Sequence, residues 1–360
     1  MKRFISVIAL LSLLLTLCAC SRRKEEIKEN ITDMMTDASE AFTTERSTAD
    51  TATTTERANE STTDESTTRR NPTAAAEQET EVEVSETELN STTGTRQMVE
   101  TGKPDANAIA GFSALQTVKY TVLANTKGLS NKKVCHSHGP ASGGQPHFTV
   151  VGFQNTFDKY GALTLDRKSK GKVLYLTFDC GWEYENLTSK ILDTLKEKKV
   201  PAAFFCTLDH IKKQPELISR MIKEGHIVGN HSATHPSFAS ISREKMVNEI
   251  ETTENYLREN FGYAAKYFRF PAGEYTENAL DLVSSLGYMS VFWSVAYNDW
   301  NVDKIQGKDY AVKTVTDRLH NGAVILLHSV SKDNAAALGE IIDKARSEGY
   351  EFKSLTEYGK

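Results

Sequence analysis

Polar and ionisable side chains follow several apolar runs of this 360-residue sequence, at the point where each run ends. The first run, Val173–Phe178, consists mainly of β-branched, aromatic and leucine residues, which is typical of a strand buried on both faces. It ends in Asp179, and a carboxylate at such a place is costly unless it has a partner or a function. The later runs end in these side chains: Asn230 and His231, Arg269, Asp299 and Trp300, and His328.

The position of these side chains favours one shared catalytic site. Taken singly, each has an ordinary explanation, because a histidine after a strand is commonly a hydrogen-bonded core residue and an arginine is commonly an ion-pair partner. In folds that alternate strands and helices, however, active sites form at the carboxyl ends of parallel strands. Their occurrence at successive strand ends therefore predicts that they assemble around Asp179.

The elements that must position these side chains alternate between helical and extended patterns. Helical spacing is present in Leu187–Leu195 and Pro215–Lys223, and it follows Ser242, a predicted N-cap, to about Asn260. Strands and helices then alternate over Tyr267–Phe270, Glu277–Leu286, Met289–Ser294, Asp309–Leu319, Ala323–His328, Asn334–Ser347 and Phe352–Leu355. This alternation predicts an α/β fold built on about seven parallel strands, either a distorted (β/α) barrel or an open doubly wound sheet.

Upstream of Val173 the sequence predicts two short strands, Tyr120–Leu123 and Phe148–Phe153, joined by a loop rich in glycine and serine. The loop contains Cys135, His136 and His138, residue types that bind zinc. One short run rarely supplies a complete set of four ligands, so we interpret these residues as members of an exposed loop.

The first 104 residues predict a targeting signal and a tether. Residues 1–20 combine a basic start with an apolar run too short for a comfortable membrane span, and they end in Leu17-Cys-Ala-Cys20. This ending resembles a bacterial lipobox, which implies lipidation of Cys20 and an extracytoplasmic chain anchored to the cell membrane. Release into the medium is the alternative. Residues 21–104 are rich in Thr, Ser and Glu and predict a disordered linker.

The net charge and the cysteine content bear on which partners the chain binds and on whether its cysteines form disulfides. The formal net charge of −5 gives no reason to expect nucleic-acid binding. Beyond the signal there are Cys135, Cys180 and Cys206, and an odd number outside the cell leaves at least one free thiol. A disulfide between Cys135 and Cys180 stays open, whereas Cys206 follows an apolar run and is predicted to be a buried thiol.

Five motifs in this order resemble the polysaccharide deacetylase family, carbohydrate esterase family 4, also called the NodB-homology domain. They are Thr177-Phe-Asp-Cys-Gly181, His231-Ser-Ala-Thr-His235, Arg269-Phe-Pro271, Trp293 with Asp299-Trp300, and Leu326-Leu-His328. The resemblance covers residues 171–360, the predicted catalytic domain, and leaves residues 105–170 as an N-terminal extension packed on it. It implies that an N-acetyl group is hydrolysed from a glycan.

A narrower resemblance concerns the branch that acts on N-acetylmuramic acid in peptidoglycan. It is carried by Phe178-Asp-x-Gly-x-Glu183, Phe292–Ala296 and Leu326–Asn334. It implies a peptidoglycan glycan strand as the substrate and a wall amidase as a partner that acts beforehand. The alternatives are an N-acetylglucosamine deacetylase, an O-acetyl esterase on another glycan, and an inactive wall-binding module.

The family resemblance also assigns the roles of the site residues. His231 and His235 are the implied ligands of a divalent metal ion, for which imidazole favours zinc. Asp179 is the implied base for the attacking water, and Arg269 pairs with it. His328 is the implied acid for the leaving nitrogen, and Asp299 orients it. The implied substrate contacts are Gly181, Pro271, Gly273, Trp293 and Trp300, with backbone N–H groups of 271–273 lining an oxyanion site.

The chain departs from the family at Cys180, where most members have a second aspartate that completes the metal site. Two interpretations remain open. Cys180 is either a thiolate ligand of zinc, together with the two histidines, or a small neutral filler in a buried position. The third motif also departs, because Ala272-Gly-Glu274 lacks the aromatic or arginine side chain often found there.

Overall fold

The computed structural model describes residues 98–101 and 108–359. The chain divides after Glu86, and the second unit is Thr87–Lys360. The described residues all belong to the second unit. The predicted signal, the lipidation at Cys20 and most of the predicted linker lie outside them. Within the described ranges, no helix is both long enough and apolar enough to cross a membrane.

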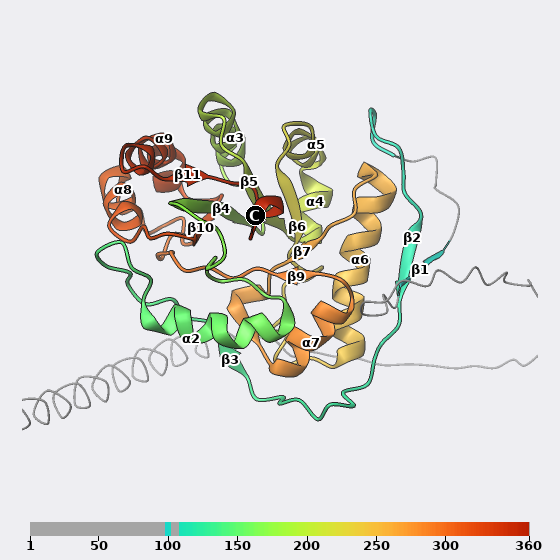
Figure 1. Cartoon of the computed structure of the whole chain (residues 1–360). Coiled ribbons are helices and arrows are strands. Elements are labelled where there is room, and N and C mark those ends of the chain that lie inside the picture. Colours follow the sequence, from blue (N-terminus) through green and yellow to red (C-terminus); the bar gives the residue numbers. More distant parts are fainter. Residues whose placement is uncertain (1–97, 102–107, 360) are drawn as a thin grey trace, which may run out of the picture. The chain divides into compact units, whose positions relative to one another are not determined.

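A parallel sheet forms the centre of the second unit (Figure 1). Its strand order is β10 (Ala323–His328), β4 (Val173–Cys180), β5 (Ala202–Cys206), β6 (Ile227–Asn230), β7 (Tyr267–Phe268) and β9 (Met289–Ser290), with β11 (Glu351–Phe352) also paired to β4. All eight residues of β4 are buried, as its apolar sequence predicts. The parallel sheet of the predicted fold is thereby confirmed.

The two ends of the sheet approach each other and make a distorted barrel. Val295, in the segment after β9, forms an isolated parallel bridge with Ile325 of β10. Leu163 and Leu165 bridge to Val291 and Ala323, so they lie in the remaining gap. A closed arrangement, and not an open doubly wound sheet, is therefore the architecture that positions the strand ends.

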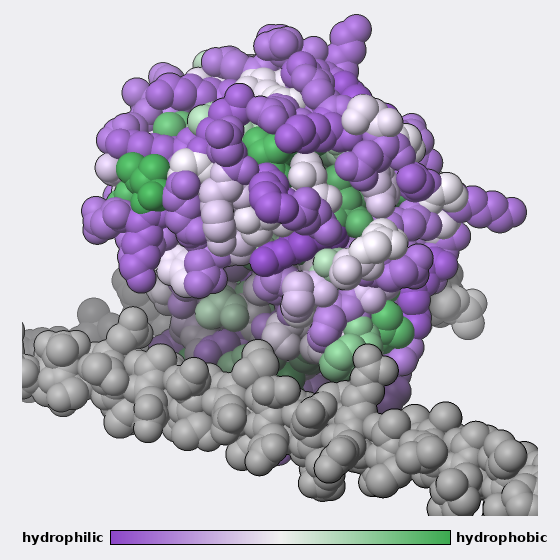
Figure 2. All heavy atoms as spheres, turned by 90° about the vertical axis from the view of Figure 1, so that its left-hand side faces the viewer, coloured by the Kyte–Doolittle hydropathy of each residue, from purple (hydrophilic) through white to green (hydrophobic). Residues whose placement is uncertain are grey.

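The helices cover the outside of the barrel. The connections along the sheet carry α3 (Leu187–Lys198), α4 (Leu208–Lys213), α5 (Pro215–Lys223), α6 (Arg243–Phe261), α7 (Glu277–Ser285), α8 (Lys308–Thr316) and α9 (Lys332–Ser347). As predicted, Ser242 caps α6, since its Oγ accepts a hydrogen bond from the Lys245 N–H at 3.3 Å. The face shown in Figure 2 is mainly hydrophilic, with small separate hydrophobic patches.

Side chains of β4 alternate between two cores. Leu174, Leu176, Phe178 and Cys180 belong to the larger core between the sheet and the helices, whereas Tyr175 belongs to a smaller core inside the barrel. This alternation follows from strand geometry, in which successive side chains point to opposite faces.

The segment before β4 differs from its prediction in two ways. Phe148–Phe157 is a helix, α2, although Phe148–Phe153 is predicted as a strand. A short apolar run fits either element, and His147 caps the helix by accepting from the Thr149 N–H through Nδ1 at 3.3 Å. The exposed-loop interpretation is also wrong for His136, which is buried with Nε2 on the Trp293 carbonyl oxygen at 2.7 Å.

Two short antiparallel pairs complete this part of the chain. β2 (Thr117–Tyr120) pairs with β1 (Met98–Thr101), and it lies beside α6. β3 (Val134–Cys135) pairs with β8 (Glu274–Tyr275), directly after the third motif. The extension therefore contacts the barrel on the side of residues 271–275, while the boundary near residue 105 stays a prediction.

Gly322, just before β10, allows a close approach that a larger residue would prevent. Its φ is +74°, and an added Cβ would overlap the Asp166 backbone carbonyl. We expect Gly322→Ala to lower the free energy of unfolding by about 3 kcal/mol, measured by urea denaturation. Gly128→Ala is the matched control, because Gly128 has φ +60° in open space, and we expect a loss of about 1–2 kcal/mol. Equal losses would contradict the steric argument.

Candidate active site

Asp179 and Arg269 form a buried ion pair where β4 and β7 end. Arg269 Nη1 donates to Asp179 Oδ1 at 2.7 Å. The guanidinium also donates from Nη2 to Thr177 Oγ1 and from Nε to the Val291 carbonyl oxygen, both at 2.9 Å. Because these bonds fix the guanidinium, it holds the carboxylate of Asp179 in one orientation.

The ion pair also keeps Asp179 ionised. Burial raises the pKa of this carboxyl group, but the charge and hydrogen bond of Arg269, with nearby His231 and His328, outweigh burial and leave the pKa below its ordinary value. An ionised carboxylate accepts protons. Asp179 therefore has the charge state that a general base requires.

His231 and His235 lie on the loop after β6, next to Asp179. His231 Nδ1 donates to the Arg269 carbonyl oxygen at 2.9 Å, which leaves the lone pair of Nε2 free. Nε2 lies 3.6 Å from Asp179 Oδ2, and the two imidazole centroids are 4.8 Å apart. The structure thus brings both histidines to the carboxylate.

The two imidazoles fit a divalent metal ion. Burial lowers the pKa of His231 to about 4, and it also lowers the pKa of His235. Neutral imidazole with a free nitrogen lone pair is the form that binds zinc and related ions. His231 and His235 are therefore the residues that would hold the metal, with the Asp179 carboxylate beside them.

The histidine loop is held in a strained conformation by a residue that the sequence patterns do not identify. Ser232 and His235 have φ angles of 68° and 57°, which non-glycine residues adopt only where the surroundings fix them. Glu249 of α6 does so, since its Oε2 accepts from the N–H groups of Ala233 and Thr234 at 3.0 and 2.7 Å. In the sequence, Glu249 stands out as a charged residue within the apolar face of α6, which indicates a buried partner without identifying it.

His328, the last residue of β10, lies opposite Asp179 in the register of the two strands. Its Nδ1 donates to Asp299 Oδ1 at 2.7 Å, and its backbone N–H donates to Oδ2 at 2.8 Å. Asn334 Nδ2 donates to the same Oδ2 at 2.6 Å, so the carboxylate is held on both oxygens. Burial opposes protonation, but the charge and hydrogen bond of Asp299 raise the pKa of His328 above its ordinary value.

Cys180 does not join the histidine pair. Asp179 and Cys180 are consecutive in a strand, so their side chains point to opposite faces, and Cys180 lies in the outer core. Its sulfur is close to Cys206 and His210 instead. The open alternative of a disulfide with Cys135 is also wrong, because Cys135 is exposed, Cys180 is buried, and both are free thiols.

The predicted oxyanion segment offers one backbone amide. Gly273 N–H donates to the Phe270 carbonyl oxygen at 3.0 Å, and Pro271 has no N–H. The Ala272 N–H donates to no acceptor in the part of the chain that the structure describes, so it is available to a ligand.

Exposed aromatic rings lie beside the polar groups. Trp300 is 55% exposed, and its ring centroid is 5.9 Å from that of His328. Trp182, which is not among the predicted contacts, is 46% exposed and follows Gly181 after β4. By contrast, Trp293 is partly buried, with its ring 5.7 Å from the guanidinium carbon of Arg269. Trp300 and Trp182 thus offer apolar surface to a ligand at the strand ends.

An ionised carboxylate, a histidine paired with Asp299 and two further histidines are therefore assembled at the carboxyl ends of neighbouring strands. The ionised Asp179 and the His328–Asp299 pair are fixed by hydrogen bonds, and the neutral histidines lie next to the carboxylate. Groups of this kind can hydrolyse an unreactive acyl bond, because that reaction needs an activated water and a proton for the leaving group.

Comparisons with known proteins agree with this chemistry. A family model described as polysaccharide deacetylase matches residues 166–291. The peptidoglycan-N-acetylmuramic acid deacetylase PdaA of Bacillus subtilis is 38% identical over 61% of this chain and 81% of that protein. A peptidoglycan-N-acetylglucosamine deacetylase of Bacillus cereus is 37% identical over 55% of this chain and 72% of that protein.

The fold agrees as well. The solved structure of Bacillus subtilis PdaA, described as a family 4 carbohydrate esterase, matches with a TM-score of 0.61 and 37% identity. The match covers 64% of this chain and 98% of the PdaA chain. These matches in sequence and in fold show that the chain belongs to the polysaccharide deacetylase family, carbohydrate esterase family 4.

Proposed function

We propose that this polysaccharide deacetylase removes the N-acetyl group from N-acetylmuramic acid in peptidoglycan, with a divalent metal ion, zinc, as its cofactor. The observation that carries the proposal is the facing pair of groups on β4 and β10. Arg269 favours the ionised form of Asp179, and Asp299 favours the protonated form of His328. One group accepts a proton and the other donates one, as amide hydrolysis requires.

Each group has a defined part in the reaction. Asp179 accepts a proton from the water that attacks the acetamide carbonyl carbon. When bound at His231 and His235, the metal ion supplies Lewis acidity towards the carbonyl oxygen. The Ala272 N–H is free to donate to the developing oxyanion. His328 then gives its proton to the nitrogen as the C–N bond breaks, which releases acetate and leaves an amine on the sugar.

The choice of sugar is supported by one relative and by the narrower motif resemblance. PdaA is named for N-acetylmuramic acid, and this chain covers 81% of it. Asn334, from the last motif of that resemblance, holds Asp299 by a 2.6 Å hydrogen bond. The Bacillus cereus relative named for N-acetylglucosamine is nearly as similar, at 37% identity, so deacetylation of N-acetylglucosamine is the second candidate.

We also propose that the enzyme acts outside the cytoplasm, as a lipoprotein held to the bacterial membrane through Cys20. The support is the lipobox-like ending of residues 1–20 and the Thr-, Ser- and Glu-rich segment 21–104, which is long enough to act as a tether. Peptidoglycan is an extracytoplasmic substrate, which suits this location. A wall amidase that removes the stem peptides beforehand would supply the glycan strands.

The substrate proposal is tested with the full chain, zinc, and glycan strands that are either intact or stripped of stem peptides by an amidase. We expect mass analysis of the fragments to show acetyl loss from muramic acid residues of stripped strands only. The Asp179→Asn chain is the control for background hydrolysis. Acetyl loss from glucosamine residues alone would support the second candidate, and no acetyl loss with zinc bound would support a wall-binding module.

Asp299 is expected to set the alkaline limit of activity. His328 must be protonated to act as the acid, so kcat falls as the pH rises through the pKa of His328. Asp299 and Asp179 raise this pKa, burial and Arg269 lower it, and the net result is a pKa above the ordinary value. Asp299→Asn removes the supporting charge, and we expect the alkaline limb of the pH–kcat profile to move to lower pH. In His328→Ala we expect that limb to disappear and kcat to fall about 10²–10⁴-fold. An unshifted limb in Asp299→Asn would contradict the assignment.

A further inference from the structure

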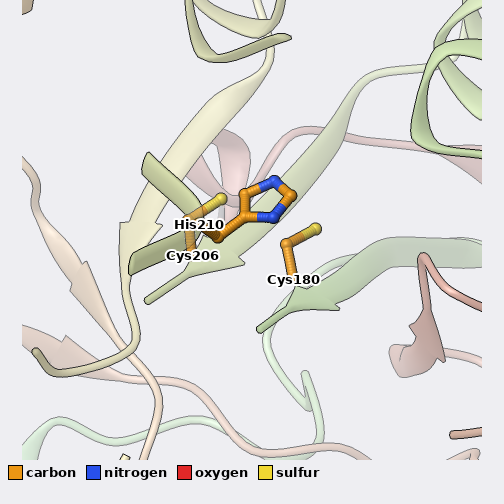
Figure 3. A group of neighbouring side chains, drawn as sticks. All are labelled: Cys180, Cys206 and His210. Carbon is orange, nitrogen blue, oxygen red and sulfur yellow. The ribbon is translucent and has the colours of Figure 1, made fainter. Parts of the chain in front are cut away.

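A second cluster of side chains of metal-binding types lies at the end of β4, on the face of the sheet that packs against the helices. Cys180 ends β4, Cys206 ends β5, and His210 belongs to α4, the helix that follows β5. One ligand atom from each lies within 4.8 Å of the other two, and all three residues are buried. Figure 3 shows the side chains gathered around the imidazole of His210.

His210 is the unusual member of this cluster. It is 1% exposed, and neither ring nitrogen has a hydrogen-bond partner among the described residues. Buried polar atoms are normally paired, so an unpaired nitrogen on a buried ring beside two thiols points to a ligand that binds it. Burial lowers the pKa of His210 to about 4, which leaves the imidazole neutral and able to donate a lone pair.

We propose that Cys180, Cys206 and His210 form a structural site for zinc, separate from the His231 and His235 pair. Soft thiolate ligands with imidazole are the donor set that zinc prefers. Binding forms two Zn–S bonds and one Zn–N bond, and it releases the two thiol protons to solvent. Zn–S bonds are about 2.3 Å long, so small side-chain rotations bring the three atoms into range.

Charge balance favours zinc over a monovalent ion. Two thiolates and one divalent cation sum to zero, which suits a site within an apolar core. A monovalent soft ion such as Cu(I) would leave a net negative charge in the same place. Burial raises the pKa of the Cys206 thiol, so a nearby cation is needed to stabilise its thiolate. The three protein ligands leave one coordination position for a further ligand such as water.

The site would join β4, the strand that carries Asp179, to the neighbouring strand β5 and to α4. The Thr207 backbone N–H donates to the Cys180 carbonyl oxygen at 3.2 Å, and Thr207 Oγ1 donates to that of Gly181 at 3.0 Å. The His231 N–H donates to the Cys206 carbonyl oxygen at 3.0 Å. An ion bound here therefore fixes the ends of β4 and β5 and the start of α4, one hydrogen bond away from His231. It does so whichever sugar the enzyme acts on.

The test is zinc content of the full chain carrying His231→Ala and His235→Ala, which removes the other candidate site. We expect one zinc ion per chain after dialysis. Adding Cys206→Ser or His210→Gln is expected to abolish binding, while Cys135→Ser, at an exposed thiol, is expected to retain it. Cobalt(II) added to the unsubstituted chain is expected to give thiolate-to-metal charge-transfer absorption that Cys206→Ser loses.

Several results would overturn the proposal. One is that the chain without the histidine pair binds no zinc. Another is that this chain still binds zinc after Cys206→Ser and after His210→Gln. A third is a Cys180–Cys206 disulfide in the intact mass, since the two residues are partners in strand register. Where a variant fails to fold, X-ray absorption at the zinc edge of the unsubstituted chain decides, because nitrogen and oxygen ligands alone would contradict a thiolate site.

Discussion

The buried ion pair between Arg269 and Asp179 is the interaction on which the active site depends. Removing one partner of such a pair typically costs about 3–5 kcal/mol, because the other charge stays buried without compensation. Arg269 also spans the barrel: its backbone N–H donates to the Asn230 carbonyl oxygen at 3.1 Å, and its side chain reaches Thr177 and Val291. Its own carbonyl accepts from His231. One residue therefore sets the orientation of Asp179 and the tautomer of His231, and it links several strands of the sheet.

The two faces of β4 place different groups at the same strand end. Asp179 points into the barrel, where Arg269 and the histidine pair meet it, whereas Cys180 points outward to Cys206 and His210. The departure of Cys180 from the family pattern therefore does not place a thiolate beside His231. It places a second thiol next to one already present on β5, and this juxtaposition is what the proposed structural zinc site requires.

Much of this arrangement is encoded locally and was predictable. The apolar run before Asp179, the N-cap at Ser242 and the boundaries of β10 follow from composition and periodicity, since strands and caps are specified by nearby residues. Other features depend on tertiary packing. Phe148–Phe157 is helical although its apolar run fits a strand, and α4 is too short to show a periodic pattern. Glu249 holds the histidine loop from a distant helix, and spacing in the sequence does not reveal such contacts.

If Arg269 acts on catalysis through Asp179, the two residues are coupled, and a double-mutant cycle measures that coupling. The deacetylation rate is compared in the unsubstituted chain, Asp179→Asn, Arg269→Lys and the double variant, with thermal unfolding used to check that each chain is folded. Residues that act as a unit give non-additive losses. We expect the double variant to be no slower than Asp179→Asn alone. A double variant whose loss is the product of the two single losses would show that the residues act independently and would contradict it.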